Sequence, residues 1–237
     1  MSELVRYAVV DGVATLAMDD GKANVMSEAM LQALDAGFDR AQADGATVLL
    51  TGRPGMFSGG FDLAVFKTDP AALFRMLEAG ARLTEKVLSF PYPVVAACSG
   101  HAIAMGAFLL LSTDLRIGVD QGARIQINEV KIGLTLPRFA TEVCRQRLSP
   151  AHFSRAVLTA EPYSGQQAVV AGFLDEVCPS ESLALTAVER AKALSTLHLE
   201  SFRATKLRLR GATLDALRVA IDGDVAEWHK RFLPDRG

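Results

Sequence analysis

The 237-residue sequence is poor in the features that mark several large classes of protein. Its three cysteines are too few and too scattered for a disulfide framework or a zinc knuckle. The 25 basic and 27 acidic residues nearly balance, so no basic field is available to hold a nucleic-acid backbone. Walker loops, dinucleotide fingerprints, Gly-x-Ser-x-Gly elbows and His-Glu-x-x-His motifs do not occur. We therefore expect no nucleic-acid partner.

The first residues also lack the basic and apolar segments of a signal peptide, so we expect a cytoplasmic protein. One nearly uninterrupted apolar run, Val94–Leu111, approaches the length of a membrane span. The polar residues at 98–101 favour a different reading. That reading is a buried strand over Val94–Cys98, a tight turn, and a buried helix over about Met105–Ser112. No second run of that length occurs, so a membrane span is the weaker alternative and no membrane partner is expected.

What the sequence does contain is typical of a folded α/β protein. Half of its residues are hydrophobic and 22% are charged, which excludes intrinsic disorder. Strand-like and helix-like segments alternate, and everything from about Ser180 onward has a helical pattern. Ser27 and Asp69-Pro70 are expected to begin helices. We expect a hairpin over 5–18, strands at 47–51, 94–98, 115–118 and 173–177, and later helices at 138–148, 151–159 and 166–171.

The helical tail is amphipathic and should pack on the core or on another subunit, because a bare apolar stripe would favour association. Its apolar positions are Leu207, Leu214, Leu217, Val219 and Ile221. Its basic positions are Arg203, Lys206, Arg208 and Arg210, which we interpret as a solvated helix face.

Two glycine-rich loops carry the first chemical signal. The loop at 57–63, Phe-Ser-Gly-Gly-Phe-Asp-Leu, follows a buried strand, and the loop at 99–107 lies between a buried strand and a buried helix. Small residues there let the backbone approach a ligand, and the first N–H groups of the helix stay unpaired. Each loop alone is most simply a turn. If both converge on one point, they form an oxyanion hole.

The second signal is an acid among apolar neighbours. Glu129 is flanked by Ile127, Val130 and Ile132, which suggests an apolar pocket. Loss of hydration in such a pocket raises the pKa of a carboxylate towards neutrality. Taken alone, Glu129 is more simply interpreted as a surface acid at a strand edge. His101 is interpreted as a hydrogen-bonded turn residue, because no partner acid or nucleophile is evident near it.

Taken together, these segments resemble the crotonase superfamily, which is the enoyl-coenzyme A (CoA) hydratase/isomerase family, over about residues 5–178. The resemblance implies an α/β fold: a crotonase-like spiral of ββα units over 1–178. It also implies a helical C-terminal trimerisation region over 179–237 that builds a homotrimer or hexamer. The implied substrates are acyl-CoA thioesters, as in fatty acid metabolism. Because CoA belongs to the substrate, no separate cofactor and no metal is implied.

The resemblance also assigns residues. The thioester oxygen would be held by the backbone N–H groups of Phe61 and Met105, and Glu129 would be the catalytic acid/base. Lys22 and Lys67 would be candidates for the coenzyme's phosphates. The implied substrate-binding residues are Lys22, Ala23, Val25, Gly60, Asp62, Leu63, Gly106 and Phe108.

One departure from the family pattern bears on the reaction. Hydratases of this family carry two glutamates, and the position of the first is Phe108 here, whereas the second is kept as Glu129. The usual Gly-x-Gly-Gly-Thr stretch is also replaced, by residues 134–139. A single base that returns its proton suits an isomerase that shifts a 3-enoyl to a 2-enoyl thioester. A hydratase, which is a lyase, and a weakly catalytic acyl-CoA-binding protein remain the alternatives.

Overall fold

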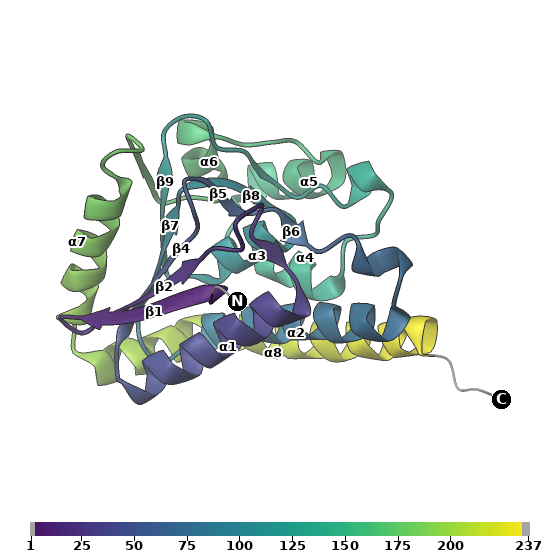
Figure 1. The fold of residues 1–237 in the computed structure, drawn as a ribbon, viewed down its shortest axis with the longest axis horizontal. Helices are drawn as coiled ribbons and strands as arrows, with labels where there is room; N and C mark the ends of the chain where they lie inside the picture. The colour runs from purple at the N-terminus through teal and green to yellow at the C-terminus, as the bar shows by residue number, and fades with distance from the viewer. Residues whose placement is uncertain (1–2, 234–237) are drawn as a thin grey trace.

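A six-stranded sheet forms the centre of the computed structural model, which describes residues 3–233 (Figure 1). Its strands are β1 (Val5–Val10), β2 (Val13–Met18), β4 (Thr47–Thr51), β7 (Val94–Cys98), β9 (Leu115–Val119) and β11 (Glu176–Cys178). They lie in the order β1-β2-β4-β7-β9-β11. Only the β1–β2 hairpin is antiparallel, and the other neighbours pair in parallel. The described part of the chain is therefore built mainly from parallel crossover units.

Short strands and helices complete those units. The short strands are β3 (Val25–Met26), β5 (Gly55–Ser58), β6 (Gly60–Phe61), β8 (Gly100–Ile103) and β10 (Ile125–Gln126). The helices are α1 (Glu28–Ala43), α2 (Pro70–Ser89), α3 (Met105–Ser112), α4 (Arg138–Arg145), α5 (Pro150–Thr159), α6 (Gly165–Ala171), α7 (Leu183–Ser195) and α8 (Leu199–Phe232). Single 3₁₀ turns are η1 (Val65–Lys67) and η2 (Val130–Ile132).

The order of these elements repeats. β4, β7 and β9 each place one strand in the large sheet, the next strand (β5, β8 or β10) joins a smaller parallel sheet, and a helix follows. The expected spiral of ββα units is therefore confirmed.

Local sequence signals explain several element ends. The Ser27 hydroxyl accepts the N–H of Met30 at 3.2 Å and begins α1, and the Asp69 carboxylate accepts two N–H groups at the start of α2. Asp11 and Gly12 adopt the positive φ angles that a two-residue hairpin turn needs. The predictions for these positions are confirmed.

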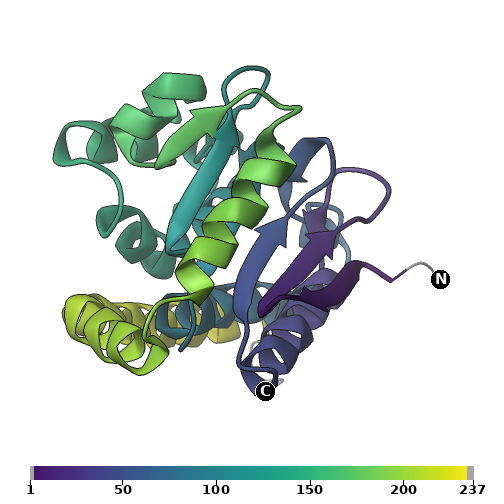
Figure 2. The same ribbon diagram turned by 90° about the vertical axis from the view of Figure 1, so that its left-hand side faces the viewer.

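Helices cover both faces of the large sheet, which explains its most apolar strand. Figure 2 shows α7 lying across one face, and α1, α2 and α3 pack on the other. Every residue of β7 is buried because it faces helices on both sides. The apolar run at 94–111 is thus core strand and core helix. No helix among the described residues is long and apolar enough to cross a bilayer.

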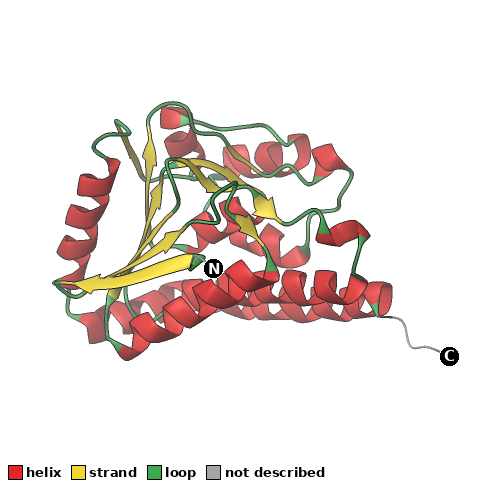
Figure 3. Cartoon of the chain, viewed as in Figure 1, coloured by secondary structure: helices red, strands yellow, loops and turns green. Residues whose placement is uncertain are grey.

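The last helix packs on the core, which is one of the two arrangements expected for it. α8 runs beneath the molecule against α2 and α4 (Figures 1 and 3). Its buried residues include Leu214, Leu217 and Ile221, whereas Leu207 and Val219 are exposed. Because Leu214, Leu217 and Ile221 are already covered within one chain, they do not argue for a trimer, and the assembly stays a prediction.

Two of the four basic residues of α8 correct the expectation of a solvated face, whereas Arg203 and Arg208 are exposed as expected. Lys206 and Arg210 are buried, and both pair with Asp114, at 2.8 and 2.9 Å. They reach Asp114 because α8 crosses the ends of α2 and α3, and a helical periodicity does not reveal that crossing.

Three segment boundaries also differ. The segment expected as a tight turn before α3 contains β8, because that segment pairs on both sides with β5 and β10. α4 ends at Arg145, and β11 begins only at Glu176 because the N–H groups of Phe173 and Leu174 donate to the Ala168 carbonyl in the last turn of α6.

Candidate functional site

The two glycine-rich loops lie in contact. A Cβ atom added to Gly60 would come within 2.8 Å of the Ile103 carbonyl oxygen, and one added to Gly106 within 2.7 Å of the Ser58 carbonyl oxygen. Gly60 also has a φ of 90°, which L side chains rarely adopt. The backbones therefore meet where no side chain fits, and this contact brings Phe61 and Met105 to one place.

A third loop closes on the same place. The N–H of Gly59 donates to the Ala23 carbonyl at 2.8 Å, and Val25 in β3 pairs with Gly60 in β6. The Ser58 hydroxyl donates to the Asn24 carbonyl at 2.7 Å and accepts the N–H of Gly60 at 3.1 Å. Of the expected substrate contacts, Ala23, Val25, Gly60 and Gly106 are thus assembled together.

The start of α3 presents a free donor. Met105 is the first helical residue, and no acceptor among the described residues takes its N–H. Ala104 before it has φ 48° and ψ −117°, a strained backbone for a residue other than glycine. The turn therefore directs the first N–H of the helix away from the preceding strand.

Strand pairing brings Glu129 towards this turn. In β10, Gln126 pairs with Ile103 of β8, and its carbonyl accepts the N–H of Ala104 at 2.9 Å. Glu129 lies three residues beyond that pair, and Met105 lies two residues beyond it. The acid and the donor therefore leave adjacent parallel strands at the same edge.

One oxygen of the largely buried Glu129 carboxyl group has no hydrogen-bond partner among the described residues. The residue is 7% exposed, and the oxygen without a partner is Oε2. Burial raises its pKa from the usual 4.5 to about 7, against a smaller opposing effect of a backbone hydrogen bond. At neutral pH both protonation states are populated, as an acid/base requires.

Helix α4 supplies a wall beside this acid. Burial raises the pKa of the Cys144 thiol, and the Glu129 charge raises it further, so the thiol lies near the carboxylate. On the same helix, Phe139 contacts Phe108 edge-to-face, with centroids 5.9 Å apart. Phe108 is fully buried. The position where hydratases of the resembled family carry their first glutamate is therefore occupied by Phe108, which packs against Phe139 away from water.

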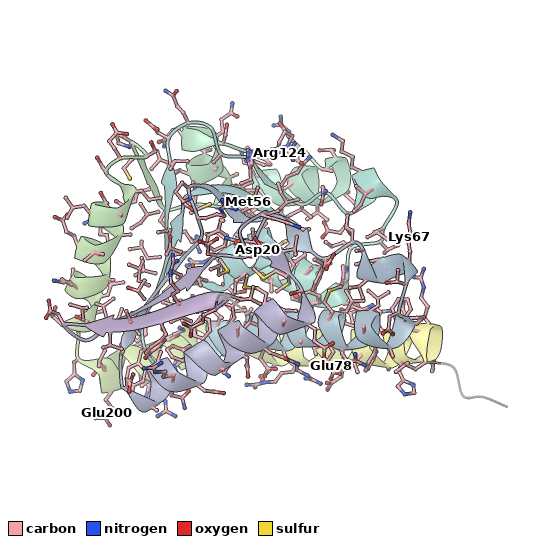
Figure 4. All side chains as sticks on the ribbon, viewed as in Figure 1. Asp20, Met56, Lys67, Glu78, Arg124 and Glu200 are labelled. Atoms are coloured by element: carbon pink, nitrogen blue, oxygen red, sulfur yellow. The ribbon has the colours of Figure 1, made fainter. Side chains whose placement is uncertain are left out.

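Other expected contacts lie at the surface. Lys22, Leu63 and Lys67 are exposed, and Figure 4 shows Lys67 at the outer edge of the molecule. The Asp62 carboxylate accepts the N–H of Ala64 and so shapes its own loop. The backbone of Lys22 is held in place, since its carbonyl accepts from Arg53 at 2.8 Å.

A cavity of ≈ 620 Å³ lies on the outer side of η2, α4 and α5. None of Phe61, Met105 and Glu129 lines it. Val130, which directly follows Glu129, and Leu134 do line it.

Sequence reasoning missed the residues that fix the first loop. Asp20 and Asn24 do so from the segment between β2 and β3. Burial alone would raise the pKa of Asp20, but three backbone N–H groups lower it. Asn24 is fully buried at φ 48° and donates to the Met18 carbonyl at 3.1 Å. The Asp-x-x-x-Asn spacing is the sequence signal that could have revealed this structured loop.

The comparison with protein families agrees with this site. A family model described as enoyl-CoA hydratase/isomerase matches residues 9–234, nearly the whole sequence. The chain belongs to the enoyl-CoA hydratase/isomerase family. It is therefore an enzyme of the crotonase type, a family that acts on acyl-CoA thioesters.

Solved structures carry both reaction names. A Mycobacterium tuberculosis protein is named an enoyl-CoA isomerase in one structure and a probable enoyl-CoA hydratase in another. In the first it is 42% identical, with 96% of this chain and all of that chain covered and a TM-score of 0.92. An enoyl-CoA hydratase of Mycobacterium marinum is also 42% identical, covering 95% and 99%, with a TM-score of 0.91. The human mitochondrial delta3-delta2-enoyl-CoA isomerase, at 24% identity and a TM-score of 0.91, covers 98% and 93% and shares the fold. Similarity gives the family and leaves the reaction open.

Proposed function

We propose that the enzyme shifts the double bond of an enoyl-CoA thioester from the 3 to the 2 position. In this reaction the Glu129 carboxylate takes a proton from C2, and the electron pair passes into the thioester oxygen. The same carboxyl group then returns the proton to C4, and the double bond forms between C2 and C3. Glu129 ends as it began, so no second acid is needed.

The backbone N–H groups of Phe61 and Met105 would hold the thioester oxygen. Negative charge develops there only after C2 loses its proton, so each donor stabilises the enolate more than the substrate. A donor of this type contributes about 3–4 kcal/mol to the transition state. The contact between the two glycine-rich loops supports this role, since it fixes both donors before substrate arrives.

The observation that carries the isomerase proposal is the buried Glu129 carboxyl group, whose Oε2 has no hydrogen-bond partner among the described residues and whose pKa is raised by burial. Hydration of a double bond favours a second group that orients the water. The corresponding position here is Phe108, buried against Phe139. Hydration of 2-enoyl thioesters is the second candidate function, because the Mycobacterium marinum relative is named a hydratase.

Turnover of 3-enoyl-CoA and 2-enoyl-CoA by the purified protein tests the proposal. We expect isomerisation of the first substrate to exceed hydration of the second. In Glu129→Gln, isomerisation should fall by at least about 10²-fold, the low end for loss of a general base, while thioester binding persists. The control is Glu200→Gln, an exposed acid at the opposite end of the molecule from Lys67 (Figure 4). Near wild-type isomerisation by Glu129→Gln excludes it as the base. Binding without turnover of either thioester by the wild-type protein leaves a binding protein instead.

A further inference from the structure

A buried carboxylate of α8 lies at the beginning of α4. Asp224 is 2% exposed, and its two oxygens accept the first two N–H groups of the helix, from Arg138 at 3.1 Å and Phe139 at 2.9 Å. The Arg138 guanidinium also contacts Asp224, at 3.0 Å, and Glu227, at 2.8 Å. Those two ion pairs are made by a half-exposed side chain and contribute little. The two backbone hydrogen bonds are the buried part of the contact.

Helix α4 has no cap of its own. Its N-cap residue is Pro137, and no side chain at that position accepts a hydrogen bond. The first N–H groups of a helix need an acceptor when they are buried. Asp224 provides that acceptor from a position 86 residues later in the chain than Arg138.

The helix that Asp224 caps is the wall beside the acid/base. Phe139 stands between Phe108 and Trp228 of α8, with centroids at 5.9 and 6.3 Å. Further along α4, Cys144 lies near Glu129. Among the described residues, the raised pKa of Glu129 has burial as its main cause and no charged neighbour. Thr141 and Arg145 of α4 also line the same cavity as Val130, the residue after Glu129, so α4 packs beside the segment that carries Glu129.

We propose that Asp224 is a positioning residue: by capping α4 from α8, it holds the wall of Phe139 and Cys144 in place and keeps water from Glu129. The inference rests on the proposed function insofar as Glu129 is the acid/base. If the cap is lost, the first turn of α4 frays, water reaches the carboxylate, and Glu129 titrates like an exposed acid.

A titration that needs no turnover tests this inference. The Glu129 carboxyl carbon is followed by ¹³C NMR against pH and assigned by its loss in Glu129→Gln. We expect a midpoint near pH 7 in the wild-type protein and a midpoint lower by at least about one unit in Asp224→Ala. Asp224→Asn, which keeps one acceptor oxygen, should fall between them. The matched control is Asp222→Asn on the same helix, whose side chain is 72% exposed.

A rescue separates capping from general stability. Pro137 has φ −61° and ψ 154°, the backbone of an N-cap residue, so aspartate there can cap α4 locally. In the double variant Pro137→Asp/Asp224→Ala, the Glu129 midpoint should return to the wild-type value. If Asp224→Ala alone does not fold, the double variant still decides. A wild-type midpoint supports the inference, and a lowered midpoint or an unfolded protein overturns it.

The acid limb of the isomerase pH profile gives a second readout. The limb should move to lower pH in Asp224→Ala by the same amount as the NMR midpoint, whereas a purely structural loss lowers the rate without moving it. An unchanged NMR midpoint in folded Asp224→Ala overturns the inference whatever the activity. If the wild-type protein isomerises nothing, the proposed function fails, and the titration still tests Asp224.

Discussion

Two largely buried acids of this enzyme have opposite surroundings. The Asp114 side chain, 13% exposed, pairs with Lys206 and Arg210 and accepts the N–H of Val94 at 2.8 Å. Glu129 has no charged partner among the described residues, and one of its oxygens is unpaired. The paired acid is committed to holding α8 on the core. The unpaired acid keeps a proton equilibrium near neutral pH, which is the property that a catalyst needs.

Helix ends explain how the charged region tolerates its cations. Lys206 lies 3.5 Å from the Val87 carbonyl, and Arg210 donates to the Leu88 carbonyl at 2.9 Å, both at the end of α2. The partial negative charge of a helix C-terminus favours cations there. Burial nevertheless lowers the pKa of Lys206 to about 8, with Asp114 opposing that shift. The packing of α8 therefore holds the Lys206 ammonium group in a position where burial disfavours its charge.

The largest effect is expected from breaking the charged region. Asp114→Asn leaves Lys206 and Arg210 buried without an anion, so the free energy of unfolding should fall by about 3–5 kcal/mol. Urea unfolding at pH 7 measures this change. The control is Asp215→Asn, whose side chain is 79% exposed beside Arg218 and should change stability by less than about 1 kcal/mol. Equal effects of the two variants would contradict the assignment of Asp114.

The next effect concerns the unpaired acid. Folding raises the pKa of Glu129 from 4.5 to about 7, so between these values the native state binds more protons than the unfolded chain. The contribution of this shift to the free energy of unfolding is therefore fully present below pH 4.5 and is lost as the pH rises through 7. It amounts to about 3 kcal/mol in total. Glu129→Gln should lack this component in unfolding experiments from pH 4 to 8. A Gln variant with the wild-type pH dependence would show that Glu129 is not the group.

A smaller effect is expected where a residue acts through its backbone. Met105 is buried at the start of α3, and Met105→Leu keeps both its volume and the N–H. The free energy of unfolding should change by less than about 1.5 kcal/mol, and isomerisation should be nearly unchanged. Loss of activity with binding and fold intact would mean that the side chain takes part in the reaction.

The smallest effect is expected from removing one of the two cations. Lys206→Met leaves Arg210 paired with Asp114, so stability at pH 7 should change by no more than about 1 kcal/mol. Because folding lowers the pKa of Lys206 from 10.5 to about 8, wild-type stability has a component that rises between these pH values. The Met variant should lack that rise. A loss as large as in Asp114→Asn would show that the two cations are not interchangeable.

Much of this architecture could be predicted from the sequence, because the signals for it are local. Long buried strands, the helix caps at Ser27 and Asp69, and the glycine-rich loops need no knowledge of distant residues. The two-residue strands β3, β6 and β10 have no periodicity and exist only through pairing, so they were not predicted.

The raised pKa of Glu129 agrees with the prediction, but two of the three apolar neighbours that were expected to bury it do not do so. Ile127 is buried, whereas Val130 and Ile132 are 49% and 45% exposed. Burial therefore also comes from residues outside this apolar stretch, including Cys144 of α4. The buried cations of α8 were misread for the same reason. Their partner Asp114 lies 92 residues from Lys206, and only the fold brings the two together.

The position of α8 at the end of the chain has a consequence for biosynthesis. Chains are made from the N-terminus, and the proposed donors, the proposed base and α4 all precede α8. Yet the acceptor for the first N–H groups of α4 and the cations that pair with Asp114 are made last. A nascent chain can thus contain every residue of the proposed reaction before α8 exists to pack against α4. Catalytic competence should consequently appear late in synthesis, once α8 has docked.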